Sequence, residues 1–209
     1  MEAAIRLADE GGVESLSMRK LGQALGVEAM SLYNHVANKD DVMSSLANRV
    51  ASEFEPPRDD EPWDTALRRS ALSARSALKR HPWAAKLMLS AAWAAEARLA
   101  FMDAQLRCLR RAGFSADETY HAYHVLDGHI FGFSLWLQSH ELPEHAEDLP
   151  ALLEEFLQRL PLDDYPDVLE HARMHVAEGA HQEVSAFELG LDLILDGLRR
   201  MRASAPRPE

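Results

Sequence analysis

The chain has 209 residues, 47% of them hydrophobic, which suits one large globular domain or two small ones. Its single cysteine, Cys108, excludes an intrachain disulfide, and no apolar stretch is long enough to span a bilayer, so we expect a cytoplasmic protein without a membrane partner. The formal net charge of −12 excludes a uniformly basic nucleic-acid-binding protein, because affinity for DNA depends on cations that neutralise phosphates.

The N-terminal part of the chain predicts three short helices. Apolar residues at helical spacing favour helices over residues 1–11 and 18–25, and Ser17 is a good N-cap for the second of them. Gly26 ends that helix, because glycine adopts the left-handed C-terminal conformation without strain, and a further helix is predicted over residues 28–36. Two short helices joined at a glycine corner are typical of a helix-turn-helix motif, whose second helix lies in the major groove of DNA.

The outer face of the predicted helix 28–36 suits contact with DNA. Acidic residues are absent from it after Glu28, and its side chains can meet thymine methyls, phosphates and base edges: Ala29, Met30, Ser31, Tyr33, Asn34 and His35. Arg19, Lys20 and Lys39 supply cations on both sides of it. From residue 17 to residue 39 there are three basic residues and one acidic residue, a net charge of +2, so positive charge is concentrated here.

The remaining elements are also predicted to be helical. A helix over residues 40–54 is followed by the proline-rich and charged segment 55–62, which excludes helix and is expected to be a linker. Helical periodicity then favours helices over residues 63–80, 82–93, 95–112, 116–140, 149–160, 166–178 and 183–202. Residues 141–149 are expected to form a loop, and no segment alternates convincingly as a strand.

Several strings in the first fifty residues carry a resemblance to a known family. They are Ala4-Ile-Arg-Leu-Ala-Asp-Glu-Gly-Gly-Val, Leu16-Ser-Met-Arg-Lys-Leu-Gly, Leu25-Gly-Val, Ser31-Leu-Tyr-Asn-His-Val and Asn38-Lys-Asp-Asp-Val. On these strings, residues 3–50 resemble the DNA-binding domain of the tetracycline-repressor-like (TetR) family. Further along, Phe187-Glu-Leu-Gly-Leu-Asp-Leu-Ile-Leu-Asp-Gly-Leu resembles the last helix of the branch closest to the tetracycline repressor itself.

The resemblance implies an all-α homodimer that regulates transcription, usually a repressor that a small molecule releases from a palindromic operator on double-stranded DNA. It implies a helix-turn-helix DNA-binding domain with its connecting helix at residues 1–54, a linker at 55–62, a helical ligand-binding and dimerisation domain at 63–203, and a flexible tail at 204–209. By this resemblance, the residues expected to contact DNA are Met18, Arg19, Ala29, Met30, Ser31, Tyr33, Asn34, His35 and Lys39.

Aromatic and methionine residues of the second part of the chain are candidates for a small-molecule site. Most large apolar side chains serve packing, but their number across adjacent helices, mixed with a few polar groups, also permits an apolar cavity. The candidate lining residues are Trp83, Met88, Trp93, Phe101, Met102, Tyr120, Tyr123, His124, Asp127 and Phe131. These residues favour an apolar or aromatic effector. Gly128 and Gly132, each costing roughly 1 kcal/mol in a helix relative to alanine, favour close approach of a partner helix or a ligand.

Apolar stripes on the predicted helices 116–140 and 183–202 favour a homodimer in which these helices pack against their two-fold mates. The stripes comprise Val125, Phe131 and Leu135 on the first helix and Phe187, Leu191, Ile194, Leu195 and Leu198 on the second.

Metal binding and catalysis have weaker support. His121 with His124, and His171 with His175, have spacings that suit a metal ion, but solvated helix faces carry such pairs more often, so we assign no metal and no cofactor. Nucleophile elbows, phosphate-binding loops, dinucleotide fingerprints and paired-cysteine motifs do not occur in the sequence, so we expect no enzyme. The alternatives are a helical small-molecule-binding protein or an enzyme, with a weak or decayed DNA-binding face.

Overall fold

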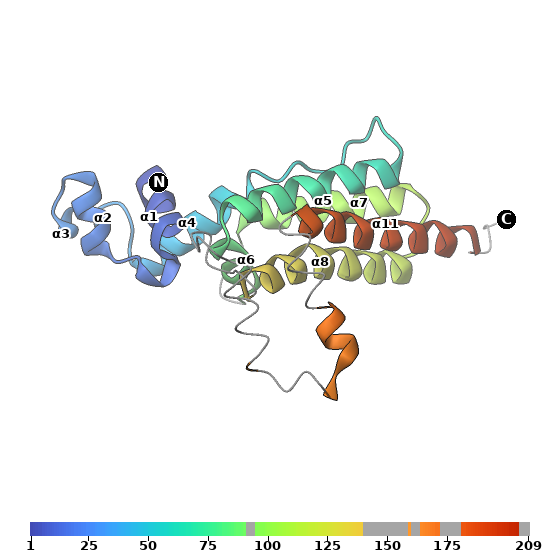
Figure 1. The fold of residues 1–209 in the computed structure, drawn as a ribbon. Coiled ribbons are helices and arrows are strands. Elements are labelled where there is room, and N and C mark those ends of the chain that lie inside the picture. Colours follow the sequence, from blue (N-terminus) through green and yellow to red (C-terminus); the bar gives the residue numbers. More distant parts are fainter. Residues whose placement is uncertain (91–94, 140–158, 160–163, 172–180, 205–209) are drawn as a thin grey trace.

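The computed structural model describes residues 1–90, 95–139, 159, 164–171 and 181–204, and these residues confirm the predicted all-α fold (Figure 1). Within these ranges no strand occurs, and no helix is long and apolar enough to cross a membrane. The helices are α1 (Glu2–Gly11), the 3₁₀ helix η1 (Val13–Ser15), α2 (Met18–Leu25), α3 (Ala29–Leu32), α4 (Lys39–Ala51), α5 (Trp63–Arg80), α6 (Trp83–Leu89), α7 (Glu96–Arg111), α8 (Ala116–Ser139) and α11 (His181–Ser204).

The helices form a small group at one end of the molecule and a longer bundle at the other (Figure 1). We call α1, η1, α2 and α3 the head, and α5, α6, α7, α8 and α11 the body. Helix α4 connects them. Its buried residues include Val42 and Leu46 near the head and Val50 on its last turn, followed by the buried Phe54 just beyond it. One helix therefore contributes apolar side chains along its whole length.

Most helix bounds lie within a few residues of the predicted ones, but α3 is shorter. The predicted helix 28–36 ends at Leu32, and Tyr33 and Asn34 donate backbone hydrogen bonds to the carbonyls three residues earlier, at 3.2 and 3.3 Å. These tighter bonds turn the chain toward α4 instead of extending the helix. Asn38 then caps α4 by accepting a hydrogen bond from the backbone N–H of Asp41 at 2.9 Å.

The other differences lie farther along the chain. The predicted helix 82–93 ends at Leu89, because Ser90 has extended backbone angles. Of the predicted helix 166–178, residues 166–171 are helical, and the remainder lies outside the described residues. The predicted loop 141–149 lies outside them too, as does the predicted helix 149–160 apart from residue 159.

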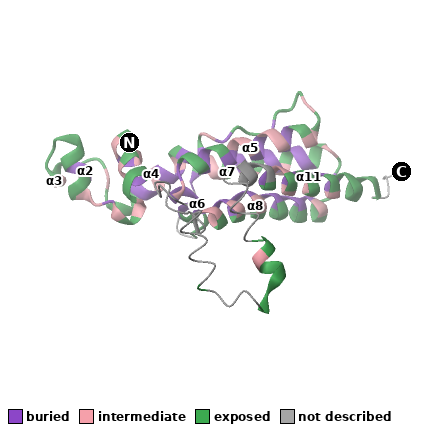
Figure 2. Ribbon diagram, viewed as in Figure 1, coloured by how far each residue is buried: buried purple, intermediate pink, exposed green. Residues whose placement is uncertain are grey.

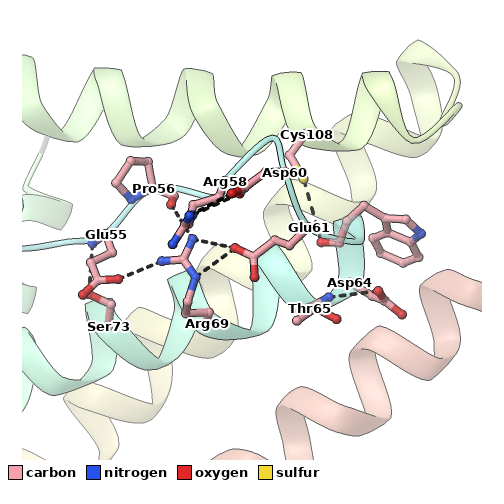
Figure 3. Close-up of polar contacts among 11 residues, drawn as sticks. Glu55, Pro56, Arg58, Asp60, Glu61, Asp64, Thr65, Arg69, Ser73 and Cys108 are labelled. Carbon is pink, nitrogen blue, oxygen red and sulfur yellow. Dashed lines mark hydrogen bonds and ion pairs between the residues drawn. The ribbon is translucent and has the colours of Figure 1, made fainter.

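The segment 55–62 is held against the body by charged side chains (Figure 3). Arg69 of α5 donates hydrogen bonds to Glu61 at 2.9 Å, to Glu55 at 2.7 Å and to the carbonyl of Pro56 at 3.1 Å. The hydroxyl of Ser73 accepts from the backbone N–H of Glu55 at 2.9 Å. The predicted linker is thus fastened to α5 at several points, as Figure 3 shows.

Polar side chains join the head to the body. Asp9 of α1 accepts a hydrogen bond from Trp83 Nε1 at 2.7 Å, and the same carboxylate oxygen lies 2.8 Å from His81 Nδ1. Arg80 donates to Glu53 at 2.7 Å, and His81 Nε2 lies 3.7 Å from that carboxylate. We call Asp9, Glu53, Arg80, His81 and Trp83 the junction cluster. Desolvation acts to raise the pKa of Glu53, but the Arg80 hydrogen bond and neighbouring cations outweigh it and lower that pKa.

Helix α4 also contacts the beginning of α7. The side-chain oxygen of Asn48 accepts a hydrogen bond from the backbone N–H of Ala97 at 2.8 Å, in the first turn of α7. Phe54 packs edge-on against Phe101 of α7, with ring centroids 5.2 Å apart, and lies 6.5 Å from the ring of Phe131 of α8. Any displacement of the start of α7 therefore acts directly on α4.

The junction cluster yields a prediction about stability. Asp9→Ala leaves the indole N–H of the buried Trp83 and the ring of His81 without their acceptor, which costs about 1–3 kcal/mol for such groups. We expect the free energy of unfolding, measured by urea denaturation, to fall by about that amount. Glu10→Ala on the same helix is the control, because Glu10 is exposed, and should change the free energy by less than about 0.5 kcal/mol. Equal midpoints for the two variants would contradict this role.

Candidate nucleic-acid interface and core polar site

The corner between α2 and α3 is built from local signals that the sequence contains. Ser17 accepts a hydrogen bond from the backbone N–H of Lys20 at 3.2 Å and caps α2, as predicted. Gly26 adopts the predicted left-handed conformation, with φ 69° and ψ 27°. The N–H of Val27 then bonds the carbonyl of Gly22 at 2.9 Å, which closes the end of α2. The backbone of α3 is thereby fixed against α2.

Gly22 has a role that sequence reasoning missed. A Cβ added to this residue would lie 2.8 Å from the carbonyl oxygen of Val27 and 3.2 Å from the backbone nitrogen of Ala29. Both atoms belong to the backbone at the start of α3, so neither can move as a flexible side chain would. Glycine in the interior of a helix is unfavourable by roughly 1 kcal/mol. That cost is the signal that could have identified Gly22 as the point where α2 comes closest to the backbone at the start of α3.

The residues predicted to contact DNA lie on α2, on α3 and just beyond, and most of them are exposed. Figure 2 shows this end of the head as mostly exposed, and Met30 is exposed at 75% of its surface and Tyr33 at 45%. Arg19, Ser31, Asn34, His35 and Lys39 are exposed too, whereas Met18 and Ala29 are half-buried. The nine residues thus lie on α2, on α3, in the turn after α3 and at the first residue of α4, and Figure 1 shows α2 and α3 at the end of the molecule remote from the body.

The cations at this end are available to an external anion. Across the described residues, no carboxylate forms an ion pair with Arg19, Lys20 or Lys39. By contrast, many basic residues of the body are paired with carboxylates, as Arg68 is with Glu188 at 2.5 Å. The unpaired cations around α3 suit phosphate contacts, and the small and apolar side chains between them suit contact with base edges.

The residues predicted to line a ligand site do not form one cluster. Trp83, Met88, Phe101, Tyr123 and Phe131 are buried, and Met102 and Asp127 are half-buried. Trp83 belongs to the junction cluster, where its ring N–H is bonded to Asp9. Tyr120 and His124 lie on the exposed face of α8, with ring centroids 4.3 Å apart. Trp93 lies outside the described residues.

The polar centre of the buried group is Arg98, which sequence reasoning also missed. Its Nη2 atom donates hydrogen bonds to Asp127 and, at 3.2 Å, to the hydroxyl of Tyr123, and its guanidinium lies 4.7 Å from the ring centroid of Phe131. Burial raises the pKa of the Tyr123 hydroxyl. A basic residue in the first turn of a helix opposes the helix dipole, and that unfavourable position was the signal in the sequence.

Of the two histidine pairs considered for metal binding, the structure describes His121, His124 and His171. Within the described residues, groups of three or more potential metal ligands do not occur. His121 lies 3.6 Å from Asp117, and His124 Nδ1 lies 2.7 Å from the carbonyl of Tyr120. His171 is exposed, and His175 lies outside the described part of the chain.

The exposed apolar faces of α8 and α11 differ in part from the predicted ones. Phe131, Phe187, Leu191, Leu195 and Leu198, predicted for a subunit interface, are buried in the protomer's own core. Val125, which the prediction also included, is exposed, as are Trp136 on α8 and Leu189, Leu193 and Met201 on α11. A Cβ added to Gly128, Gly132 or Gly197 would meet nothing within 4 Å, so these glycines leave open space beside the two helices.

Two family models match this chain. The model described as bacterial regulatory proteins, tetR family, matches residues 1–46, and the model described as tetracyclin repressor-like, C-terminal domain, matches residues 55–202. Among curated proteins, the tetracycline repressor protein class C of Escherichia coli is 32% identical over 207 residues, which cover 97% of this chain and 90% of that protein.

Solved structures share the fold. A possible TetR family transcriptional regulator from Streptomyces coelicolor A3(2) has a TM-score of 0.77 at 27% identity and covers 96% of this chain and 97% of its own. A TetR variant from Acinetobacter baumannii AYE in complex with minocycline has a TM-score of 0.69 at 25% identity, with 97% of this chain and 96% of its own covered.

The contact at Gly22 yields a second prediction. Alanine at this position gains up to about 1 kcal/mol of helix propensity, but overpacking against backbone atoms costs about 1–3 kcal/mol, so we expect Gly22→Ala to destabilise the corner. Thermal unfolding followed by circular dichroism should show a lower midpoint. Gly26→Asn is the matched control, because asparagine tolerates the left-handed region and the space around Gly26 is open. A Gly22→Ala midpoint at or above that of the wild type would show that the contact is not restrictive.

Proposed function

Because this chain belongs to the TetR family of bacterial regulatory proteins, and is thus a DNA-binding transcriptional regulator, we propose that it is a repressor. Two copies bind a palindromic operator, and a small apolar or aromatic molecule releases them. The observation that supports this best is the exposed corner of α2 and α3, with unpaired cations around it. The family consists of regulators, and we propose that the chain regulates without catalysing a reaction.

The proposed contacts divide into two kinds. Arg19, Lys39 and Tyr33 bind phosphates, because their hydrogen-bond donors are exposed. Contacts to phosphates do not depend on the base sequence. Ala29 and Met30 meet thymine methyls, and Asn34 reads a base edge through its amide. The phosphate contacts set affinity, whereas the base contacts set sequence preference.

The proposed dimer is formed through α8 and α11. These helices contact each other within one protomer, partly through His129, whose ring stacks on Phe187 with centroids 4.6 Å apart. Leu189 and Leu193 on the outer side of α11 are exposed at 62% and 61%. Packing of this outer face against its two-fold mate would cover those side chains and hold two heads on the half-sites of a palindrome.

The proposed release mechanism uses the contacts of α4. Two heads read adjacent major grooves only when they are about 34–36 Å apart. A molecule bound in the body near the start of α7 displaces Ala97 and Phe101, and these residues hold α4 through Asn48 and Phe54. The molecule must bind the arrangement that does not fit DNA more tightly, and a difference of about 1–3 kcal/mol is typical. The complex of the similar Acinetobacter protein with minocycline supports a small-molecule effector.

The division of DNA contacts can be tested with a panel of operator variants from the promoter region of the chain's own or adjacent gene. We expect Arg19→Ala and Lys39→Ala to weaken binding to every variant by a similar factor and to reduce its salt dependence. Asn34→Ala should instead change which variant is preferred, by about 1–3 kcal/mol at one position. Gel shifts at one salt concentration measure the affinities and preferences, and a series of salt concentrations measures the salt dependence. Arg107→Ala on α7, remote from the head, should leave binding unchanged. Absence of any wild-type shift would remove the proposed function.

The dimer can be tested by charge introduced on the outer face of α11. We expect Leu193→Glu to produce a monomer at micromolar concentration in light scattering, because each dimer would bury two unpaired carboxylates. Leu99→Glu is the control, since Leu99 is exposed at 54% on α7, and this variant should remain dimeric. A wild-type protein that is monomeric in the same measurement would refute the assembly.

A further inference from the structure

Exposed apolar side chains of the head gather at the corner between α2 and α3 and on α3 itself. Leu25, Val27, Met30 and Tyr33 lie within nine residues of sequence, and each exposes 45% or more of its surface. Met30 is exposed at 75%, more than any other large hydrophobic residue in the described part of the chain. Single exposed apolar residues are ordinary on protein surfaces, whereas a local concentration of them marks a surface that binds a partner.

The backbone that carries Met30 is held in place. A Cβ added to Gly22 of α2 would lie 3.2 Å from the backbone nitrogen of Ala29, so α2 and α3 touch directly before Met30. The carbonyl of Met30 accepts a hydrogen bond from the backbone N–H of Tyr33 at 3.2 Å. An exposed apolar side chain on a fixed backbone suits a partner of regular geometry, and the major groove of DNA is such a partner.

Charge distinguishes this apolar group from the exposed leucines of α11. Arg19 and Lys39 stand on either side of it in the sequence and, among the described residues, pair with no carboxylate. Glu28 is the only acidic residue between them. The exposed leucines of α11 neighbour acidic side chains instead, Glu188 and Asp192. Apolar side chains bordered by unpaired cations match the major groove, where thymine methyl groups lie between two rows of phosphates.

The side chains of α3 and of the turn after it favour A·T base pairs. A bidentate contact to guanine requires arginine or lysine, and residues 29–35 contain neither. The amide of Asn34 is exposed and matches the N6 and N7 atoms of adenine, while Met30 matches the C5 methyl group of thymine. Ser31 and His35 hydrogen-bond with more than one base, so they do not set the preference. Over a G·C pair, Met30 would cover polar atoms of the base edge without pairing them, which is unfavourable.

We propose that Met30 selects thymine through its C5 methyl group, and that the operator base pairs contacted by α3 are therefore A·T pairs. This inference rests on the proposed function, since it names the class of operator that the head recognises. The methyl group itself is the recognised feature, because Met30 has no hydrogen-bond donor and its sulfur is only a weak acceptor. Asn34 adds a hydrogen-bonded contact to adenine in the same half-site, so the two residues favour the same class of base pair.

The first part of the test selects operators with the full-length protein from a library of duplexes whose central stretch, about two helical turns long, is random. We call the positions whose base preference relaxes in Met30→Ala the Met30-dependent positions, and we expect A·T pairs there in the wild-type selection. Leu99→Ala is the matched control, because Leu99 of α7 is exposed at 54%, and it should select the wild-type sequences. Thermal unfolding should give similar midpoints for all three proteins, since both truncated side chains are exposed.

The second part changes single groups of the selected operator. Deoxyuridine differs from thymidine only in lacking the C5 methyl group, so deoxyuridine at a Met30-dependent position should weaken wild-type binding by about fourfold and leave Met30→Ala binding nearly unchanged. At the same position, 5-methylcytosine opposite guanine should bind the wild type about fourfold better than cytosine does. Thymidines outside these positions serve as controls, and their replacement should have little effect.

Three results would overturn the proposal: G·C pairs at the Met30-dependent positions, selection of the same sequences by the wild type and Met30→Ala, or the same response of these two proteins to deoxyuridine. A full-length protein that selects no sequence at all would instead remove operator binding, and with it the proposed function. The failure of the inference and the failure of the function are therefore separate results.

Discussion

The structure depends on the fact that α4 lies in a hydrophobic core that continues from the head into the body. Val42, Leu46, Val50 and the adjoining Phe54 belong to this core, and all four are at most 5% exposed. Burial of each such side chain contributes about 1.5–3 kcal/mol, so moving α4 out of this core is costly. The inclination of α4 relative to the body therefore sets the position of α2 and α3.

Directional contacts fix that inclination in a way that apolar packing alone does not. In the junction cluster, one oxygen of Asp9 meets two ring nitrogens, and a carboxylate oxygen of Glu53 meets Arg80. The two contacts of Asp9 are partly buried hydrogen bonds to a carboxylate, which tolerate little displacement, whereas the contact between Arg80 and Glu53 is exposed. The exposed ion pair between Lys86 and Glu14 spans the same boundary, but solvent-exposed pairs contribute little, so it adds less to the orientation. The polar contacts thus fix the angle between α4 and the body, and the hydrophobic contacts stabilise the helix at that angle.

The sequence could predict those features whose causes are local. Ser17 and Gly26 were recognised because a capping hydroxyl and a left-handed glycine act on their immediate neighbours. Gly22 and Arg98 were missed because their roles depend on residues that folding brings to them. Most of the predicted subunit stripe lies in the protomer's own core, since α8 and α11 are apolar on two sides and periodicity does not tell which side meets that core. Arg98 Nη1 and Gln105 Oε1 of α7 are buried and have no hydrogen-bond partner among the described residues. This could not be predicted, because an absent partner is visible only after every other side chain is placed.

The attachment of residues 55–62 to the body has a consequence for how such regulators diversify. Arg69 and Ser73 fasten this segment along α5, so it does not act as a free tether between exchangeable modules. A recombination joint placed there would transfer α4 with the incoming head and separate Asn48 and Phe54 from the α7 residues that match them. A joint just before α4, near the cap at Asn38, would preserve these contacts but would separate Asp9 of α1 from His81 and Trp83 of the body. Neither joint keeps every contact between head and body, so the head of this chain is not exchangeable without matching changes in the body.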